Sequence, residues 1–278
     1  PMHSAGERYV MVYNGEIYNY REIRNELEGL GGAPSWRGHS DTEIMLAAIS
    51  YWGLESALRK FSGMFAFALW DRKEQVLQLA RDRLGEKPLY YGWMNNYFLF
   101  GSELKALRNH PCWQGEVNRD VLALYMRYNC VPAPYSIYKN IFKLRPGAFL
   151  SLGREDLRPE KSGSLLIQKY YWSAKEHAEQ GEQTPFKGEE SEAIGSLESL
   201  LEGSIKKQMI ADVPLGAFLS GGIDSSTVAA LMQKHSADPI KTFTVGFEEE
   251  AYNEARHAKL VAKHLGTDHT ELYVTSKE

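Results

Sequence analysis

The fold of one half of this chain is decided by the stretch Gly216-Ala217-Phe218-Leu219-Ser220-Gly221-Gly222-Ile223-Asp224-Ser225-Ser226. Its apolar beginning predicts a strand over 216–219, and the spacing of apolar residues after it predicts a helix over 225–235. The two adjacent glycines let the backbone approach a bound group without side chains in the way. Because a helix N-terminus offers unpaired N–H groups and a positive dipole end, this order of elements predicts an anion site at 220–226.

The side chains of this loop suit a magnesium-bound pyrophosphate. The hydroxyls of Ser220, Ser225 and Ser226 add hydrogen-bond donors, and Asp224 would hold the Mg²⁺ that accompanies the phosphates. The alternative is a glycine turn with a serine helix cap, which would be the better interpretation of an isolated Ser-Gly-Gly. The full run between a strand and a helix favours the phosphate site, and the absence of G-x-x-x-x-G-K-[ST] excludes the lysine-bearing phosphate loop.

The elements around the loop alternate in type. Strands are predicted over 216–219, 242–247 and 270–274, and helices over 191–209, 225–235 and 253–265. Strand and helix in alternation predict a parallel, doubly wound α/β sheet, in which ligands bind at the carboxyl ends of the strands.

The N-terminal half has a different pattern. A strand is predicted over 8–13, and Ser40-Asp41-Thr42-Glu43 has the form of a capping box, with Ser40 as N-cap and Glu43 reaching back to it. Aromatic and branched runs over 64–70, 76–80, 89–93 and 97–101 predict an antiparallel meander. Residues 154–190 are polar and lack periodicity, so we predict domains at 1–153 and 191–278 with 154–190 as a linker.

Composition limits the classes of partner. The chain has 278 residues, 43% hydrophobic and 24% charged, with a net charge of −4, which favours small-molecule partners over nucleic acid or a membrane. Its only cysteines, Cys112 and Cys130, are too few for a disulfide framework, so we expect a reducing cytoplasm. Eight histidines show no metal-binding spacing, and we assign no catalytic histidine.

Residues 220–226 resemble the SGGxDSS signature of ATP pyrophosphatases, the adenylating enzymes that include asparagine, NAD, GMP and argininosuccinate synthetases. The resemblance implies cleavage of ATP between its α and β phosphates and formation of an adenylate that an amine attacks. In that family the strand ends beside the loop cup the adenine, which assigns Leu219 and Val245 to the ATP site. For both residues, plain sheet core is the alternative.

The first half resembles the class II glutaminase domain of glutamine-dependent asparagine synthetases. The segments that carry the resemblance are Asn14-Gly15-Glu16-Ile17-Tyr18-Asn19-Tyr20, 39–43, 80–91, 102–107 and 131–134. The resemblance implies an α+β fold of the Ntn type, an αββα sandwich, before the α/β ATP-pyrophosphatase domain. It also implies that an N-terminal cysteine hydrolyses glutamine and that the ammonia passes to the adenylate.

The same resemblance assigns roles at the glutaminase site. Asn14 supplies its side-chain amide and Gly15 its backbone N–H to the oxyanion, while Glu16 and Asp41 bind the amino-acid end of glutamine. A carboxylate such as Asp41 suits an α-ammonium group. Its alternative role is as a first-turn charge on a helix. Taken alone, Asn14-Gly15 would be a type I′ hairpin signal, and only its context changes that interpretation.

The sequence departs from this family at both ends. Residue 1 is Pro, which cannot be the thiol nucleophile, and Cys112 and Cys130 lie mid-chain without a free α-amine. We therefore expect an N-terminal portion with the cysteine and a glutamine-binding arginine to be missing. We also expect the synthetase domain to continue after Glu278, and the chain as given to be an inactive fragment.

We interpret the parent protein as a cytoplasmic ligase that makes asparagine from aspartate, glutamine and Mg-ATP. One alternative is the same machinery acting on another carboxylate, such as a sugar acid in polysaccharide biosynthesis, because the acceptor pocket lies outside this sequence. Another is a catalytically silent binding module that keeps ATP or glutamine affinity or only a dimer surface. The sequence leaves a homodimer open.

Overall fold

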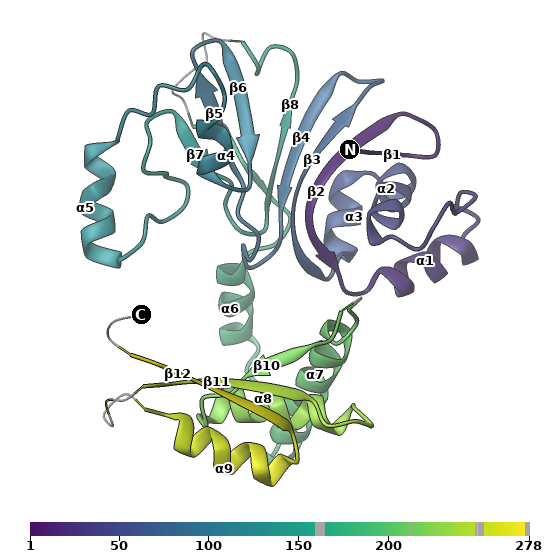
Figure 1. The fold of residues 1–278 in the computed structure, drawn as a ribbon. Coiled ribbons are helices and arrows are strands. Elements are labelled where there is room, and N and C mark those ends of the chain that lie inside the picture. The colour runs from purple at the N-terminus through teal and green to yellow at the C-terminus, as the bar shows by residue number, and fades with distance from the viewer. Residues whose placement is uncertain (159–164, 212, 248, 250–252, 276–278) are drawn as a thin grey trace. The chain divides into compact units, whose positions relative to one another are not determined.

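The computed structural model describes residues 1–158, 165–211, 213–247, 249 and 253–275. The chain divides into two compact units, Pro1–Thr184 and Pro185–Glu278. Each unit has its own core, and Figure 1 labels their elements.

The first unit contains two antiparallel sheets. The larger has the order β1-β2-β3-β4-β8-β9 and the smaller β6-β5-β7. The strands of the larger sheet are β1 (Met2–His3), β2 (Tyr9–Ile17), β3 (Gly63–Asp71), β4 (Val76–Arg81), β8 (Ala148–Leu152) and β9 (Lys169–Tyr170). Those of the smaller sheet are β5 (Tyr90–Met94), β6 (Tyr97–Gly101) and β7 (Ile141–Lys143).

Helices cover the outer faces of these sheets. The helices of this unit are α1 (Tyr20–Gly29), α2 (Asp41–Trp52), α3 (Leu54–Lys60), α4 (Leu104–Arg108), α5 (Arg119–Tyr128) and α6 (Ala174–Gln183). Helices α1 to α3 pack on the larger sheet, and α4 packs on the smaller one (Figure 1). The layers therefore run helix, sheet, sheet, helix, which is the predicted αββα arrangement, with its fourth layer formed by the short α4.

The sequence of β3 shows why both of its faces are covered. Phe65 and Phe67 pack with the helices, whereas Ala66 and Ala68 face the second sheet. Successive side chains of a strand point to opposite faces, so large residues fill the helix layer and alanines let the second sheet approach. Burial on both faces explains the unbroken apolar run over 64–70.

The predicted single meander is wrong. Strands β3 and β4 pair in the larger sheet, whereas β5 and β6 pair in the smaller one. The chain changes sheets at Asp82, whose buried carboxylate accepts hydrogen bonds from the N–H groups of Phe65, Glu86 and Lys87. These bonds hold the connecting segment in a shape that the strand pattern does not reveal.

Part of the predicted linker belongs to the first unit. Strand β9 pairs with β8, and the following Tyr171 is only 3% exposed, with its hydroxyl donating to the Arg81 carbonyl. Ser173 then caps α6. Residues 159–164 of the predicted linker lie outside the described residues. The linker prediction is thus wrong for 169–183, where one buried tyrosine anchors an otherwise polar segment.

The capping box is also only half right. Ser40 does accept a hydrogen bond from the Thr42 N–H at the start of α2. Glu43, however, accepts from the N–H groups of Arg37 and Gly38 at 2.8 and 3.0 Å instead of reaching back to Ser40. The loop before the helix therefore supplies nearer donors than the N-cap backbone.

The second unit is a three-stranded parallel sheet with the order β10-β11-β12. Its elements are α7 (Glu190–Gln208), β10 (Gly216–Phe218), α8 (Ile223–Lys234), β11 (Lys241–Phe247), α9 (Ala255–Leu265) and β12 (Asp268–Val274). Helix α9 ends at Gly266, which has a φ of 72°. The predicted strands and helices of this unit are therefore confirmed, with small shifts at their ends.

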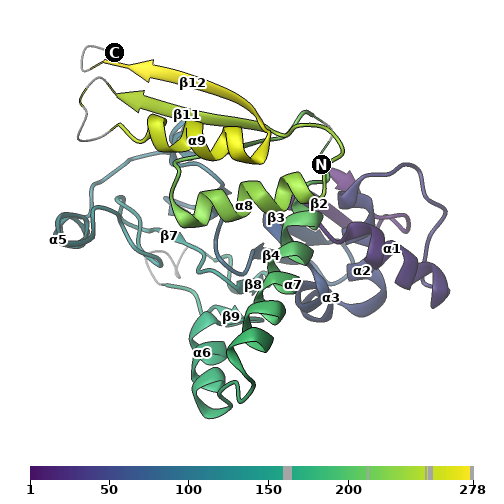
Figure 2. The same cartoon turned by 90° about the horizontal axis from the view of Figure 1, so that it is seen from below.

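In the described part of the chain, helices cover only one face of this sheet. Figures 1 and 2 show α8 and α9 on the same face, where Ala229, Met232 and Ala258 share one core. On the opposite face Phe243 and Val245 of β11 are 38% and 41% exposed. The predicted parallel strands are therefore confirmed. A doubly wound sheet also has helices on its second face, and none of the described residues forms a helix there. None of the described helices combines the length and apolarity needed to cross a membrane.

Candidate functional sites

Strand β2 exposes a backbone donor at Gly15. Its register partner Phe65 directs both backbone groups away from β2, since its N–H donates to the Asp82 carboxylate and its C=O accepts from the Asp82 N–H. Gly15 and Phe65 are therefore a non-hydrogen-bonded antiparallel pair, and the Gly15 N–H faces the other edge of β2. There β1 pairs only with Val10 and Met11, so the edge beyond them is free of strand partners in the described chain.

Only glycine fits at position 15. Its φ is 151°, and a Cβ there would lie 2.1 Å from the Met64 carbonyl oxygen. We expect Gly15→Ala to lower the free energy of unfolding of the first unit by roughly 2–4 kcal/mol, through backbone strain and overpacking. Chemical denaturation measures this. Gly6→Ala is the matched control, because a Cβ at Gly6 would meet nothing within 4 Å. Equal stabilities of the two variants would contradict the strain at Gly15.

Asn14 lies beside Gly15 with its side chain on the face toward the smaller sheet. Its Nδ2 donates to the Oγ of Ser102, the residue after β6, at 2.9 Å. Both residues line a cavity of about 240 Å³ together with Tyr13, Ala66 and Phe100, among others. One of the two amide protons of Asn14 is thus engaged by Ser102, which leaves the second available to a ligand. Ser102 lay in a segment that carried the family resemblance, but no local pattern pointed to this contact.

Asp41 reaches the same edge of β2 from the first turn of α2. Its Oδ2 accepts from the Tyr13 hydroxyl at 2.8 Å and from the Ile17 N–H at 3.0 Å. Burial, and then the neighbouring Asp41 charge, raises the pKa of Tyr13 well above its usual range, so this phenol stays a donor. The carboxylate is therefore held two residues along the edge from Gly15, and it is not a bare helix-end charge.

Glu16 belongs to an acidic neighbourhood at the end of β2. Burial raises the pKa of Tyr18 to about 12, with further contributions from the charges of Glu86, Glu16 and Asp82. Burial, followed by the Asp82 charge, also raises the pKa of Glu86. Negative charge at this place suits a cationic group of a ligand.

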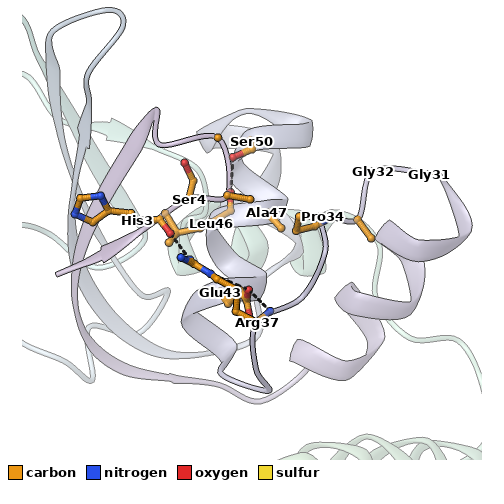
Figure 3. A pocket seen from close by; sticks show the side chains of 13 residues that line it. His3, Ser4, Gly31, Gly32, Pro34, Arg37, Glu43, Leu46, Ala47 and Ser50 are labelled. Atoms are coloured by element: carbon orange, nitrogen blue, oxygen red, sulfur yellow. Dashed lines mark hydrogen bonds and ion pairs between the residues drawn. The ribbon is translucent and has the colours of Figure 1, made fainter.

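A separate hollow of about 180 Å³ lies beside α2 (Figure 3). Glu43 faces it, and Arg37 closes one side by donating to the His3 carbonyl at 2.7 Å. None of the predicted site residues lines it. The residues predicted to bind glutamine therefore lie along or beside the β2 edge and not in this hollow.

In the second unit the glycine loop is braced by its own serines. The Ser220 Oγ accepts from the Gly222 N–H at 3.2 Å and lies 2.9 Å from the Ser225 Oγ. Gly221 has a φ of 81°, and a Cβ there would lie 2.8 Å from the Ala258 backbone nitrogen of α9. Close packing of α9 on the loop thus requires glycine at 221.

The start of α8 offers donors to an anion. Gly222 is its N-cap and provides no side-chain cap, so the first N–H groups, from Ile223 onward, have no capping partner. The Ser226 Oγ is buried without a hydrogen-bond partner in the described residues. Asp224 is exposed in the first turn. Uncapped N–H groups and an accessible carboxylate are groups that a magnesium-bound phosphate needs.

The two residues assigned to adenine differ in their surroundings. Leu219 is 2% exposed and packs in the core of the second unit, and its carbonyl accepts from the Thr244 hydroxyl. The structure therefore favours the sheet-core alternative for Leu219. Val245 is 41% exposed, which leaves its side chain accessible to a ligand.

Comparison with known families identifies both parts of the chain. The model of the glutamine amidotransferase domain family matches residues 1–171. The chain belongs to this family. The model described as asparagine synthase matches residues 196–278, so the β2 edge lies in the amidotransferase match and the glycine loop in the synthase match. The predicted resemblance is thereby confirmed.

Named relatives align along most of the chain. A putative glutamine-hydrolysing asparagine synthetase of Methanocaldococcus jannaschii is 35% identical over 97% of this chain and 49% of its own length. A glutamine-hydrolysing asparagine synthetase of Bacillus subtilis is 34% identical over 100% of this chain and 41% of its own length. The amidase chyE of Penicillium rubens is 31% identical over 96% of this chain and 39% of its own length. The chain therefore spans half or less of the length of these relatives.

Proposed function

We propose that the parent protein is a cytoplasmic, glutamine-hydrolysing asparagine synthetase. Hydrolysis of glutamine would supply ammonia to a β-aspartyl adenylate formed from aspartate and Mg-ATP. The observation that carries the proposal is the presence in one chain of a paired donor site at Asn14 and Gly15 and an uncapped phosphate loop at 220–226. The names of the relatives support it.

At the β2 edge, Asn14 and Gly15 would stabilise the oxyanion that forms when a thiolate attacks the glutamine carboxamide. Donors already in place cost no reorganisation in the transition state, which is why such sites lower barriers. Asp41 would accept the α-ammonium of glutamine, and Glu16 would add negative charge at that end. The resemblance assigns the attack to an N-terminal cysteine of the parent protein.

At the glycine loop, the N–H groups at the start of α8 would bind the β and γ phosphates of ATP, with Ser220, Ser225 and Ser226 around them. Asp224 would hold Mg²⁺, which neutralises phosphate charge when bound. The exposed Val245 would contact the adenine. Leu219 would contribute indirectly, by packing in the core that supports the loop.

The products of the full-length protein test this proposal. With glutamine, aspartate and Mg-ATP we expect asparagine, glutamate, AMP and pyrophosphate. Release of ADP and phosphate would contradict the ATP-pyrophosphatase assignment. ATP binding without any turnover would instead favour the silent binding module.

The second candidate is an amidotransferase that acts on a different carboxylate. The match to the amidase chyE supports this candidate, because a protein that is not named an asparagine synthetase also aligns along most of this chain. Glutamine-dependent AMP release that needs a carboxylate other than aspartate would support this candidate.

Asp41→Asn tests the glutamine site. If Asp41 holds the α-ammonium, KM for glutamine should rise about 10- to 100-fold, as expected for a hydrogen bond to a charged group. Synthesis from free ammonia, which bypasses this site, should keep its rate. Tyr13→Phe is the matched control, since it removes one hydrogen bond to Asp41 but keeps the carboxylate charge. An unchanged KM for glutamine, or an equal loss with ammonia, would show the assignment to be wrong.

A further inference from the structure

A cysteine and a histidine form a close pair away from both sites. The Nδ1 of His110 lies 2.8 Å from the Sγ of Cys112, just after α4. The segment is a tight turn, in which the Trp113 N–H donates to the His110 carbonyl at 2.9 Å. Pro111 is at its second position, where the fixed φ of proline favours such a turn. The turn therefore holds the ring and the thiol side by side.

The hydrogen bonds around the ring favour one of its two neutral tautomers. The Cys112 N–H, which can only donate, points to the Nδ1 of His110 at 3.3 Å. A ring nitrogen that accepts a hydrogen bond carries no proton, so the neutral imidazole has its proton on Nε2. The thiol, whose sulfur lies nearer, shares the single lone pair of Nδ1 as its donor. His110 is thus oriented to take the proton of Cys112.

The surroundings keep this geometry while leaving the thiol reachable. The His110 ring packs against Tyr97, with centroids 5.3 Å apart, and Asn95 donates to the Cys112 carbonyl at 3.3 Å. Cys112 itself is partly exposed. The other cysteine, Cys130, is exposed and has no histidine bond among the described contacts.

We propose that Cys112, which is only partly exposed, is a modification site for small electrophiles, with His110 as its general base. The sulfur forms a bond to the electrophilic carbon, and the leaving group departs with the electrons of the bond that breaks. The thiol proton passes to the Nδ1 of His110. No further reactant is needed, and this chemistry is independent of glutamine and ATP.

The test is alkylation of the chain by iodoacetamide at pH 7, followed at each cysteine by mass spectrometry. We expect His110→Gln to slow alkylation of Cys112 on the order of tenfold; an unassisted thiol is already a few per cent thiolate at this pH, which limits the gain from a base. His110→Phe should slow it equally, because it keeps a ring against Tyr97 but has no nitrogen. Cys130 in the same samples should keep its rate.

Exposure alone would give the opposite result. In His110→Gln the loss of the ring uncovers Cys112, which would speed alkylation, and in His110→Phe a ring still covers it, so slowing in both variants identifies the lost base. An unchanged or faster reaction at Cys112 would overturn the proposal. An equal fall at Cys130 would also overturn it, because the effect would then not be specific to the pair.

Discussion

Asn14→Ala is expected to lower kcat for glutamine hydrolysis in the full-length protein by about 10²–10³-fold, or roughly 2.7–4 kcal/mol, because its proposed role is that of an oxyanion donor. The reason is geometric. The Ser102 hydroxyl holds the amide of Asn14, the residue next to Gly15 in β2, and alanine removes this donor without altering the pairing of the strand. Glutamate release from glutamine measures the loss, and KM should change little because the donor acts on the transition state.

Ser102 supplies the graded control for this prediction. Its Oγ is the acceptor that orients the Asn14 amide. We therefore expect Ser102→Ala to lower kcat less than Asn14→Ala does, and Ser102→Thr, which keeps the hydroxyl, to restore most of it. Synthesis from ammonia should be unaffected in all three variants. A loss of ammonia-dependent synthesis equal to the loss with glutamine would assign the effect to folding and remove Asn14 from the oxyanion site.

The second large effect is expected at the glycine loop, where Gly221→Ala should weaken Mg-ATP binding by roughly 5- to 150-fold. At a φ of 81°, with the α9 backbone 2.8 Å from the added Cβ, alanine forces the loop or the helix to move. Strain of this kind is typically about 1–3 kcal/mol, and about 1.4 kcal/mol corresponds to tenfold in affinity. Calorimetric titration of the chain with Mg-ATP measures the change.

Three further variants show where such a loss originates. Gly222→Val should lower affinity with little loss of stability, because Gly222 has an ordinary φ and its added Cβ would meet only the Ser220 Oγ. Asp224→Ala should weaken the dependence of binding on Mg²⁺. Gly203→Ala in α7, where a Cβ would meet nothing within 4 Å, should leave binding unchanged. Equal affinities for wild type, Gly221→Ala and Gly222→Val would place the phosphates elsewhere.

Local sequence was sufficient for the second unit. The predicted strand 242–247 is β11 (Lys241–Phe247), and the predicted helix 225–235 is α8 (Ile223–Lys234). Strand, glycine pair and helix start follow one another directly, so their geometry depends on near neighbours. Sequence pattern could not say which face of the sheet each helix covers, because crossovers are set by packing.

In the first unit the errors arose where polar groups find partners outside their own helix or strand. Glu43 was assigned to Ser40, three residues away, but it binds the N–H groups of Arg37 and Gly38 in the preceding loop. Tyr171 seemed to belong to a linker, yet its hydroxyl binds the Arg81 carbonyl, 90 residues away. The meander was split between two sheets because Asp82 redirects the chain after β4.

The sequence by itself determined the strands and helices of the second unit and the family signatures of both units, because these depend on neighbouring residues. The tertiary structure decided which polar groups form hydrogen bonds within the protein and which have no partner. The Asp41 carboxylate is already bound by Tyr13 and Ile17, whereas the Ser226 hydroxyl is buried without a partner among the described residues. Such differences follow from hydrogen bonds between segments far apart in the chain, as between Asn14 and Ser102, which are 88 residues apart, and folding alone brings these groups together.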